Sequence, residues 1–186
     1  MSQLILVRHA APIIEPSRPS AEWVLSAEGR AAVVGLSARL MRYAPAIVLS
    51  GNEPKMAGTA EIIAQAVSVP VVQMPDLSEH ARRSAAYGTK ADFEKSIRRL
   101  FDEPEALVYG DESANATYDR FSAALDNALS AYDGKTVVAV SGGTAISLFI
   151  SRRSGMEAFA LWQSLQTPTA LVIARGDWKV QEILYS

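Results

Sequence analysis

The chain has 186 residues, of which 49% are apolar and 20% charged, with a formal net charge of −2 and no cysteine. The lack of cysteine excludes disulfides, thiol chemistry and cysteine-based zinc sites, and the balanced charge argues against a nucleic-acid partner, which would need a basic surface. The apolar content suffices for one well-filled core, so we expect a single domain spanning residues 1–186.

Short runs rich in Val, Ile and Leu alternate along the chain with longer amphipathic stretches. The apolar runs show little alternation, which is typical of strands buried on both faces. In chain order, the pattern predicts strands at 4–7, 46–49, 69–74, 136–140, 170–174 and 180–184. Between them it predicts helices at 27–42, 55–66, 91–101, 114–131 and 145–152. Strands that alternate with helices predict an α/β fold, a three-layer α/β/α sandwich around a mostly parallel sheet.

Polar residues directly follow three of the predicted strands. Arg8 and His9 follow the first strand, Ser50 follows the second, and Ser141 with a pair of glycines follows the fourth. Ligands of open α/β sheets bind at the carboxyl ends of the strands. We therefore expect a site where these three strand ends meet.

His9 is one of only two histidines in the chain. Arg8 beside it would lower the pKa of the imidazole and favour the neutral, nucleophilic form. The same cation would bind an anion that the imidazole attacks, and phosphate meets both requirements. The alternative is a histidine with a purely structural role.

Two further stretches predict contacts to an anion. Pro54 opens a helix and Lys55 lies in its first turn, where it would hold an anion together with the helix dipole, or would simply be solvated. The backbone amides of Gly142, Gly143 and Thr144 would form an anion-binding nest, or the stretch would be a tight turn in which Ser141 caps the following helix. The glycines match neither a nucleotide-binding fingerprint nor an esterase elbow.

Glu79 and His80 follow the third predicted strand. Adjacent residues of an extended chain point in opposite directions, so we expect only one of them to face the site. Glu79 would serve as a general acid if burial raised its pKa; the alternative is an exposed polar loop.

These stretches, in this order, resemble the histidine phosphatase superfamily, which has the phosphoglycerate mutase-like fold. The resemblance covers almost the whole chain and is carried by LILVRHA, WVLSAEGRAAVVGLSARL, SGNEPKMAGTAEII, DLSEH, DESANATYDRF, VVAVSGGT and LQTPTALVI. They correspond to the family patterns R-H-G/A, W-x-L-[ST]-x-x-G, S-S-x-x-x-R-A-x-x-T-A, L-x-E, G-E-S-x-x-x-x-x-x-R, V-x-H-G-G and the final strand.

The resemblance implies roles for individual residues. His9 matches the nucleophile that becomes phosphohistidine, Arg8 matches the arginine that grips the phosphate, and Glu79 matches the acid that protonates the leaving oxygen. Two positions depart from the family: Lys55 replaces an arginine and Ser141 replaces a second histidine. Lysine keeps the charge but loses the planar fork of donors. The family chemistry needs no metal and no cofactor.

The resemblance leaves two main hypotheses for function. The first is a small hydrolase that acts on a phosphomonoester, in which Lys55, Ser141 and the Gly142 amide hold the phosphoryl oxygens. The second is a catalytically inactive relative that binds a phosphorylated ligand or a protein partner. Ser141 as a nucleophile is disfavoured because no neighbouring base is visible, and an inward-turned His80 would replace the missing imidazole only in competition with Glu79.

The partner implied in either case is a phosphorylated small molecule or a phosphoprotein. Residues 79–112 are expected to cover the pocket; they include Arg82, Arg83, Tyr87 and Lys90, without an indication of which face inward. The apolar runs fall far short of the ~18 residues of a membrane span, so we expect no membrane partner. The first apolar stretch has no basic region before it and is interrupted at Arg8, which favours a cytoplasmic protein over a secreted one.

Overall fold

The computed structural model describes residues 2–186, and its six-stranded sheet has the order β3-β2-β4-β1-β5-β6. The strands are β1 (Gln3–Arg8), β2 (Ile47–Ser50), β3 (Val71–Gln73), β4 (Val137–Ser141), β5 (Thr169–Ala174) and β6 (Val180–Tyr185). The pairs β1–β4, β4–β2 and β2–β3 are parallel, while β5 and β6 run antiparallel. The predicted α/β class with a mostly parallel sheet is therefore confirmed.

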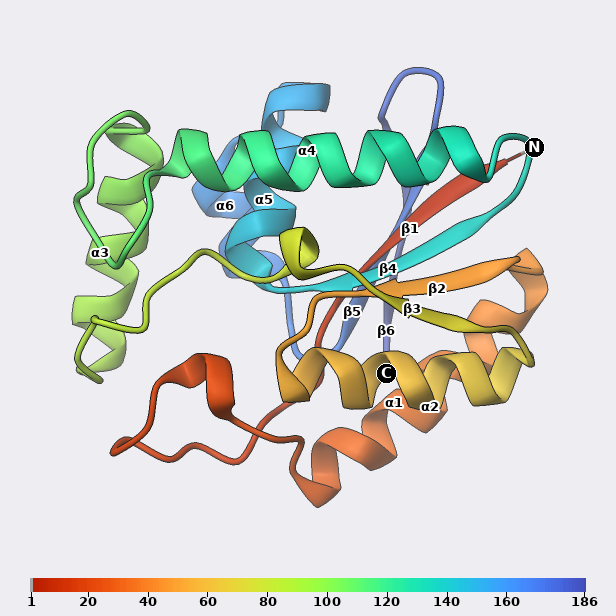
Figure 1. Cartoon of the computed structure of the whole chain (residues 1–186), viewed down its shortest axis with the longest axis horizontal. Helices are drawn as coiled ribbons and strands as arrows, with labels where there is room; N and C mark the ends of the chain where they lie inside the picture. Colours follow the sequence, from red (N-terminus) through yellow and green to blue (C-terminus); the bar gives the residue numbers. More distant parts are fainter. Residues whose placement is uncertain (1) are drawn as a thin grey trace.

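Helices cover both faces of the sheet (Figure 1). The α-helices are α1 (Ala27–Leu40), α2 (Pro54–Val67), α3 (Lys90–Asp102), α4 (Ala114–Ala131), α5 (Gly143–Ser154) and α6 (Ala158–Ser164), and short 3-10 turns lie at η1 (Ser20–Glu22), η2 (Met41–Tyr43) and η3 (Pro75–Leu77). Side chains that accept backbone N–H bonds start α1, α3 and α4 at Ser26, Thr89 and Ser113. Helix α6 was not predicted, because seven residues are too few to show a helical period.

Alternate residues of each central strand enter two separate apolar clusters. Leu4 and Leu6 of β1 pack toward α4 and α5, whereas Ile5 and Val7 pack toward α1 and α2. Burial on both faces is the reason why the central strands read as unbroken apolar runs. Helix α3 belongs to neither cluster; it packs against α6 at one end of the sheet through a third cluster that includes Ile97 and Trp162.

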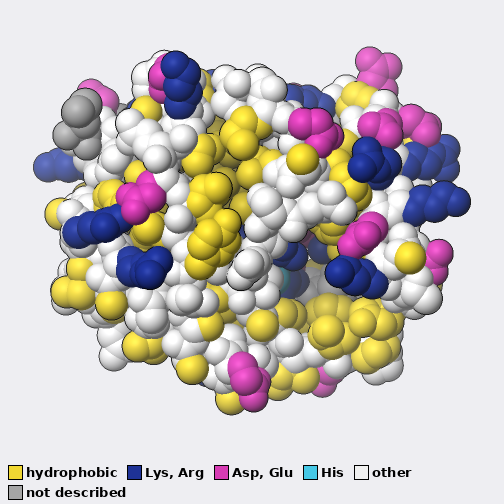
Figure 2. Space-filling model, turned by 180° about the vertical axis from the view of Figure 1, so that it is seen from behind, with side chains coloured by type: hydrophobic (Ala, Val, Ile, Leu, Met, Phe, Trp, Pro, Cys, Tyr) yellow, Lys and Arg dark blue, Asp and Glu magenta, His cyan; other side chains and the backbone are white. Residues whose placement is uncertain are grey.

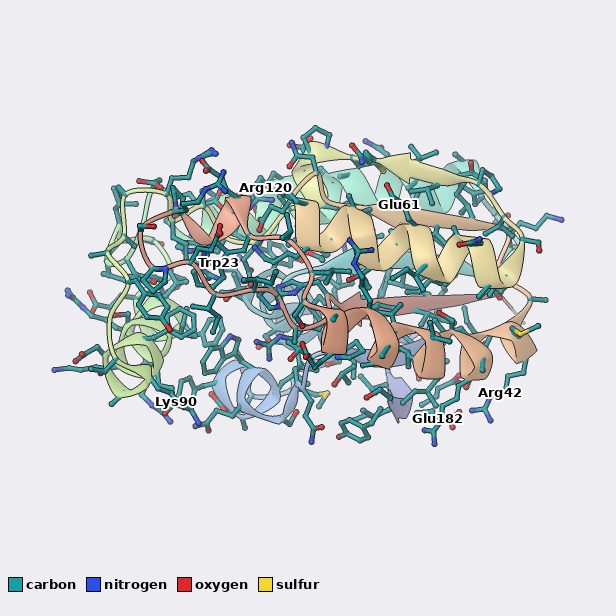
Figure 3. All side chains as sticks on the ribbon, turned by 90° about the horizontal axis from the view of Figure 1, so that it is seen from below. Trp23, Arg42, Glu61, Lys90, Arg120 and Glu182 are labelled. Atoms are coloured by element: carbon teal, nitrogen blue, oxygen red, sulfur yellow. The ribbon has the colours of Figure 1, made fainter. Side chains whose placement is uncertain are left out.

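Strand order brings the polar strand ends together. The end of β4 lies between those of β2 and β1, with Arg8 paired to Ser141 and Ser50 paired to Val140. The His9 N–H continues this pairing by donating to the Ser141 carbonyl at 2.9 Å. Figure 3 shows Trp23, Lys90 and Arg120 at the end of the molecule occupied by α3, and Arg42 and Glu182 at the opposite end. Across residues 2–186, no helix is long and apolar enough to cross a lipid bilayer.

Candidate active site

His9 follows β1 and is buried, with 7% of its surface exposed. Its Nδ1 lies 2.8 Å from the Ala10 carbonyl oxygen, which only accepts, so Nδ1 carries the hydrogen and Nε2 keeps a free lone pair. Burial lowers the pKa of His9 to about 3, and the charges of Lys55 and Arg8 add to this effect. The imidazole is therefore neutral near pH 7, and Nε2 is in the form that a nucleophile requires.

The Arg8 guanidinium lies beneath the start of α5. Its Nη1 donates to the Leu165 carbonyl, while Nε is buried and has no hydrogen-bond partner among residues 2–186. A Cβ at Gly143 would lie 3.1 Å from this Nε, so the second glycine permits the close approach of Arg8 to the helix. The guanidinium thus lies beside the helix N-terminus with an unused donor.

Backbone amides in the first turn of α5 do bind a carboxylate, that of Glu79, but of the three amides expected only Thr144 N takes part. Glu79 accepts hydrogen bonds from Thr144 N at 3.1 Å and from Ala145 N at 2.9 Å. A Cβ at Gly142 would lie 2.3 Å from the Glu79 carboxyl carbon, so only glycine leaves room for this carboxylate. In this structure the anion at the nest is therefore the protein's own carboxylate.

The charge state of Glu79 differs from the expectation of a raised pKa. Burial alone would raise the pKa of this carboxyl, but Arg82 and three backbone N–H donors, including His80 N, lower it to about 2. These groups stabilise the ionised form. The expectation of a raised pKa for Glu79 is therefore wrong, and the carboxylate lacks the proton that a general acid must carry.

Lys55 is buried rather than solvated, with 2% of its surface exposed. Its Nζ lies 2.5 Å from Glu53 Oε2 and donates to the Ser20 carbonyl at 2.5 Å. The other carboxyl oxygen of Glu53 accepts from Glu79 N at 3.0 Å. Sequence analysis did not identify Glu53, although a buried lysine requires a nearby carboxylate and Glu53 lies just two positions before it.

The hydroxyl of Ser141 is not available to donate a hydrogen bond to a phosphoryl group. The side chain is fully buried, and Oγ donates to the Leu77 carbonyl at 2.6 Å. The hydroxyl hydrogen is therefore committed to η3, and only acceptor capacity remains, which does not suit an anion. We correct the expectation that Ser141 donates to the phosphoryl group. The same bond argues against Ser141 as a nucleophile.

The ring of His80 contacts the segment before α4. Its Nε2 donates to the Glu112 carbonyl at 2.8 Å, and its ring stacks on Tyr109 with 6.0 Å between centroids. Because both contacts hold the ring in place, His80 does not supply the missing second imidazole here.

Two arginines that the sequence-based role assignment left out support the Glu79 loop. Arg120 of α4 donates to the carbonyls of Ser78 and Glu79 at 2.9 and 2.7 Å and forms an ion pair with Glu112 at 2.5 Å. Arg82 turns inward, with its Nη2 3.7 Å from the Glu79 carboxylate. The signal for Arg120 was its place in the DESANATYDRF stretch; Arg82 has no sequence signal beyond its place in the covering segment.

Two cavities are lined by charged residues of the site. One, of about 240 Å³, is lined by Arg8, Lys90, Phe93, Glu94, Trp162 and Gln163. The other, of about 280 Å³, is lined by residues of η1, by Glu53 in the loop before α2, and by Glu79 and Arg82 in the loop after η3. Figure 2 shows Lys or Arg side chains and a histidine at the bottom of a hollow whose rim is partly apolar. Arg8 lines the first cavity and Arg82 the second, so both cavities suit an anionic ligand; His9 lines neither.

Comparisons with known proteins identify the family and the fold. The family model of the histidine phosphatase superfamily (branch 1) matches residues 4–184. A search of curated proteins found no match. Among solved structures, a mycobacterial glucosyl-3-phosphoglycerate phosphatase has a TM-score of 0.73 and 18% identity, covering 100% of this chain and 97% of its own.

Two further structures have the same fold. The alpha-ribazole phosphatase from Shigella flexneri has a TM-score of 0.71 and 20% identity, with 99% of this chain and 96% of its own covered. YhfR from Bacillus stearothermophilus has a TM-score of 0.74 and 20% identity, with 97% and 96% covered. At these identities the likeness establishes the fold.

Proposed function

The chain belongs to the histidine phosphatase superfamily (branch 1), and from this premise we propose that it is a phosphomonoester hydrolase that forms a phosphohistidine at His9. The observation that carries the proposal is the protonation and burial of the His9 ring. The ring is buried and neutral, with the hydrogen on Nδ1 and the lone pair on Nε2, beside the cations Arg8 and Lys55. We further propose that it acts in the cytoplasm on a phosphorylated small molecule or a phosphoprotein.

The proposed reaction has two displacements at phosphorus. His9 Nε2 attacks the phosphorus atom, the bond from phosphorus to the ester oxygen breaks, and the leaving group departs with the electron pair. Water then attacks the phosphohistidine, the bond from phosphorus to Nε2 breaks, and phosphate is released. Arg8 and Lys55 offset the charge of the phosphoryl oxygens.

Glu79 has a different part in this proposal from the one that the resemblance implied. As an ionised carboxylate on the α5 amides, it holds the loop and the helix start together but has no proton to give. The leaving oxygen then departs without a proton from Glu79. Esters of acidic alcohols, such as phenols, are therefore the better substrates.

The direct test is turnover of para-nitrophenyl phosphate, with His9→Ala as the matched variant. A phosphoryl group trapped on the wild type, labile in acid and stable in base, would identify phosphohistidine and should be absent from the variant. Equal rates for the two proteins would reject the proposal. Two of the similar structures named above are described as phosphatases for different esters, so they favour the reaction class and no particular substrate.

A second candidate function is binding of a phosphorylated ligand without turnover. It is favoured by the position of Ser141, whose hydroxyl is bonded to Leu77, and by the ion pair that Lys55 makes with Glu53. Calorimetry with inorganic phosphate, combined with an activity assay, separates the two functions. Binding without turnover supports this candidate, and gain of turnover in a Ser141→His, Lys55→Arg variant would show which groups are missing.

A further inference from the structure

Lys55, the cation expected to bind the anion together with Arg8, already has hydrogen-bond partners within the protein. Lys55 donates to Ser20 O and to Glu53 Oε2, each at 2.5 Å, and its side chain is 3% exposed. Two of its three N–H donors are thus used, and its charge is paired with a carboxylate. Lys55 cannot by itself supply the forked, fully charged contact that a guanidinium gives to an oxyanion.

Arg82 brings a second guanidinium to the other side of the site. Its side chain is only 14% exposed, and Nη2 lies 3.7 Å from Glu79 Oε2, which is too long for a hydrogen bond. The guanidinium carbon lies 5.2 Å from the centre of the Phe93 ring, so the ring supports the planar group. The next residue, Arg83, turns outward, with 59% of its side chain exposed and an ion pair to Glu22.

Both inward-facing guanidinium groups keep an unused donor. Arg82 Nη1 and Arg8 Nε are each buried and lack a hydrogen-bond partner within the described part of the chain. Burying a charged donor without an acceptor is unfavourable. The two guanidinium charges are close enough to act on each other, and an oxyanion bound to either group would satisfy one of the unused donors.

The charge balance of the site depends on Arg82. Arg8 and Lys55 are offset by the carboxylates of Glu79 and Glu53, and His9 is neutral. Without Arg82 these charges cancel, and a phosphate would meet the negative Glu79 with no net attraction. With Arg82 paired to Glu79, one net positive charge remains for the ligand.

We propose that Arg82 binds the phosphate oxyanion of the ligand together with Arg8, so that a guanidinium from the covering loop does the work expected at the Lys55 position. The phosphomonoester as ligand follows from the proposed function, but binding of the anion does not require turnover. Phe93 positions the Arg82 side chain, and Phe93 and Arg8 together line the cavity of about 240 Å³.

The test is calorimetric titration of the full chain with inorganic phosphate. Arg82→Gln keeps the length and polarity of the side chain but removes the charge, and should raise the Kd for phosphate about 10- to 100-fold, as expected for loss of a charged hydrogen bond. The matched control is Arg83→Gln, which alters the exposed neighbour and should change the Kd by less than about threefold. Arg82→Lys, which restores charge without the fork, should fall between the wild type and Arg82→Gln.

Equal phosphate affinity of Arg82→Gln and Arg83→Gln, or no phosphate binding by the wild type, would overturn the inference. If Arg82→Gln fails to fold, Arg82→Lys decides: a Kd equal to that of the wild type contradicts the need for a forked contact. The proposed function fails separately, if the wild type binds phosphate through Arg82 but turns over no ester. If turnover occurs and Arg82→Gln leaves both KM and phosphate inhibition unchanged, the function stands and this inference falls.

Discussion

The site has two sides that are built in different ways. On the side of β1 and α2, His9 and Lys55 lie directly at the end of a strand and in the first turn of a helix, and their backbone is held by regular elements. On the side of β4 and α5, the charged groups Glu79 and Arg82 come from a loop, and the residue at the strand end, Ser141, bonds to η3 instead. The first side supplies the nucleophile, and the second supplies charge from residues that depend on how the loop is held.

His9→Ala should have the largest effect and tests the first side. Removing the nucleophile should reduce turnover of an aryl phosphate by at least about 10³-fold. Phosphate binding should persist, because both guanidinium groups are unchanged: Arg8 at the end of β1 and Arg82 in the loop of the second side. Steady-state kinetics and calorimetry on the same variant measure both quantities. If His9→Ala retained turnover, the first side would not supply the nucleophile.

Glu53→Ala should have the next largest effect, because Glu53 joins the two sides. It pairs with Lys55 through one oxygen and accepts Glu79 N through the other. Leaving Lys55 buried and unpaired should lower the free energy of unfolding by about 3–5 kcal/mol. Urea unfolding measures this, with the exposed Glu22→Ala as control, for which we expect a change of about 1 kcal/mol or less.

Leaving-group dependence tests the ionised state of Glu79. The wild type should hydrolyse para-nitrophenyl phosphate far faster than glycerol phosphate, since an alkoxide leaves poorly without a proton. Glu79→Gln should slow both esters by similar factors. A general acid contributes about 10²–10⁴ in rate, so a selective loss of that size on the alkyl ester would show that Glu79 does donate a proton.

The two sides should also lose stability in different pH ranges. The pKa of His9 is lowered from 6.5 to about 3 and that of Glu79 from 4.5 to about 2, so in both cases the unfolded chain takes up the proton first. Stability is then full above the unfolded value and falls as the pH drops toward the folded one. Urea unfolding from pH 7 to 2 should show that His9→Gln weakens the upper part of this fall and Glu79→Gln the lower part. Unchanged pH profiles in both variants would contradict the assigned charge states.

Ser141→Ala should have the smallest effect. It removes one buried hydrogen bond to Leu77, which should lower the free energy of unfolding by about 1 kcal/mol. Turnover should stay close to that of the wild type, because the hydroxyl hydrogen does not reach the phosphate side. A large loss of turnover in a folded Ser141→Ala protein would place Ser141 back among the residues that contact the ligand.

Most of the fold could be predicted from the sequence because its signals are local. Unbroken apolar runs follow from strands buried on both faces, and residues such as Arg8, His9 and Ser50 lie at strand ends wherever those strands stop. The 3-10 turns and α6 escaped prediction because elements this short have no visible period. Strand β3 is shorter than predicted.

The sequence by itself determined the α/β fold and the place of His9, because strand patterns depend on neighbouring residues, and the resemblance of its ordered motifs indicated the family. Only the tertiary structure decided the partners of the charged groups. Glu79 reaches the amides of Thr144 and Ala145, 65 and 66 positions away, and Ser141 bonds to Leu77 across 64 positions. Arg82 turns inward while Arg83 turns outward. Which of two like residues is buried depends on packing and charge contributed by distant segments, and no local pattern records that choice.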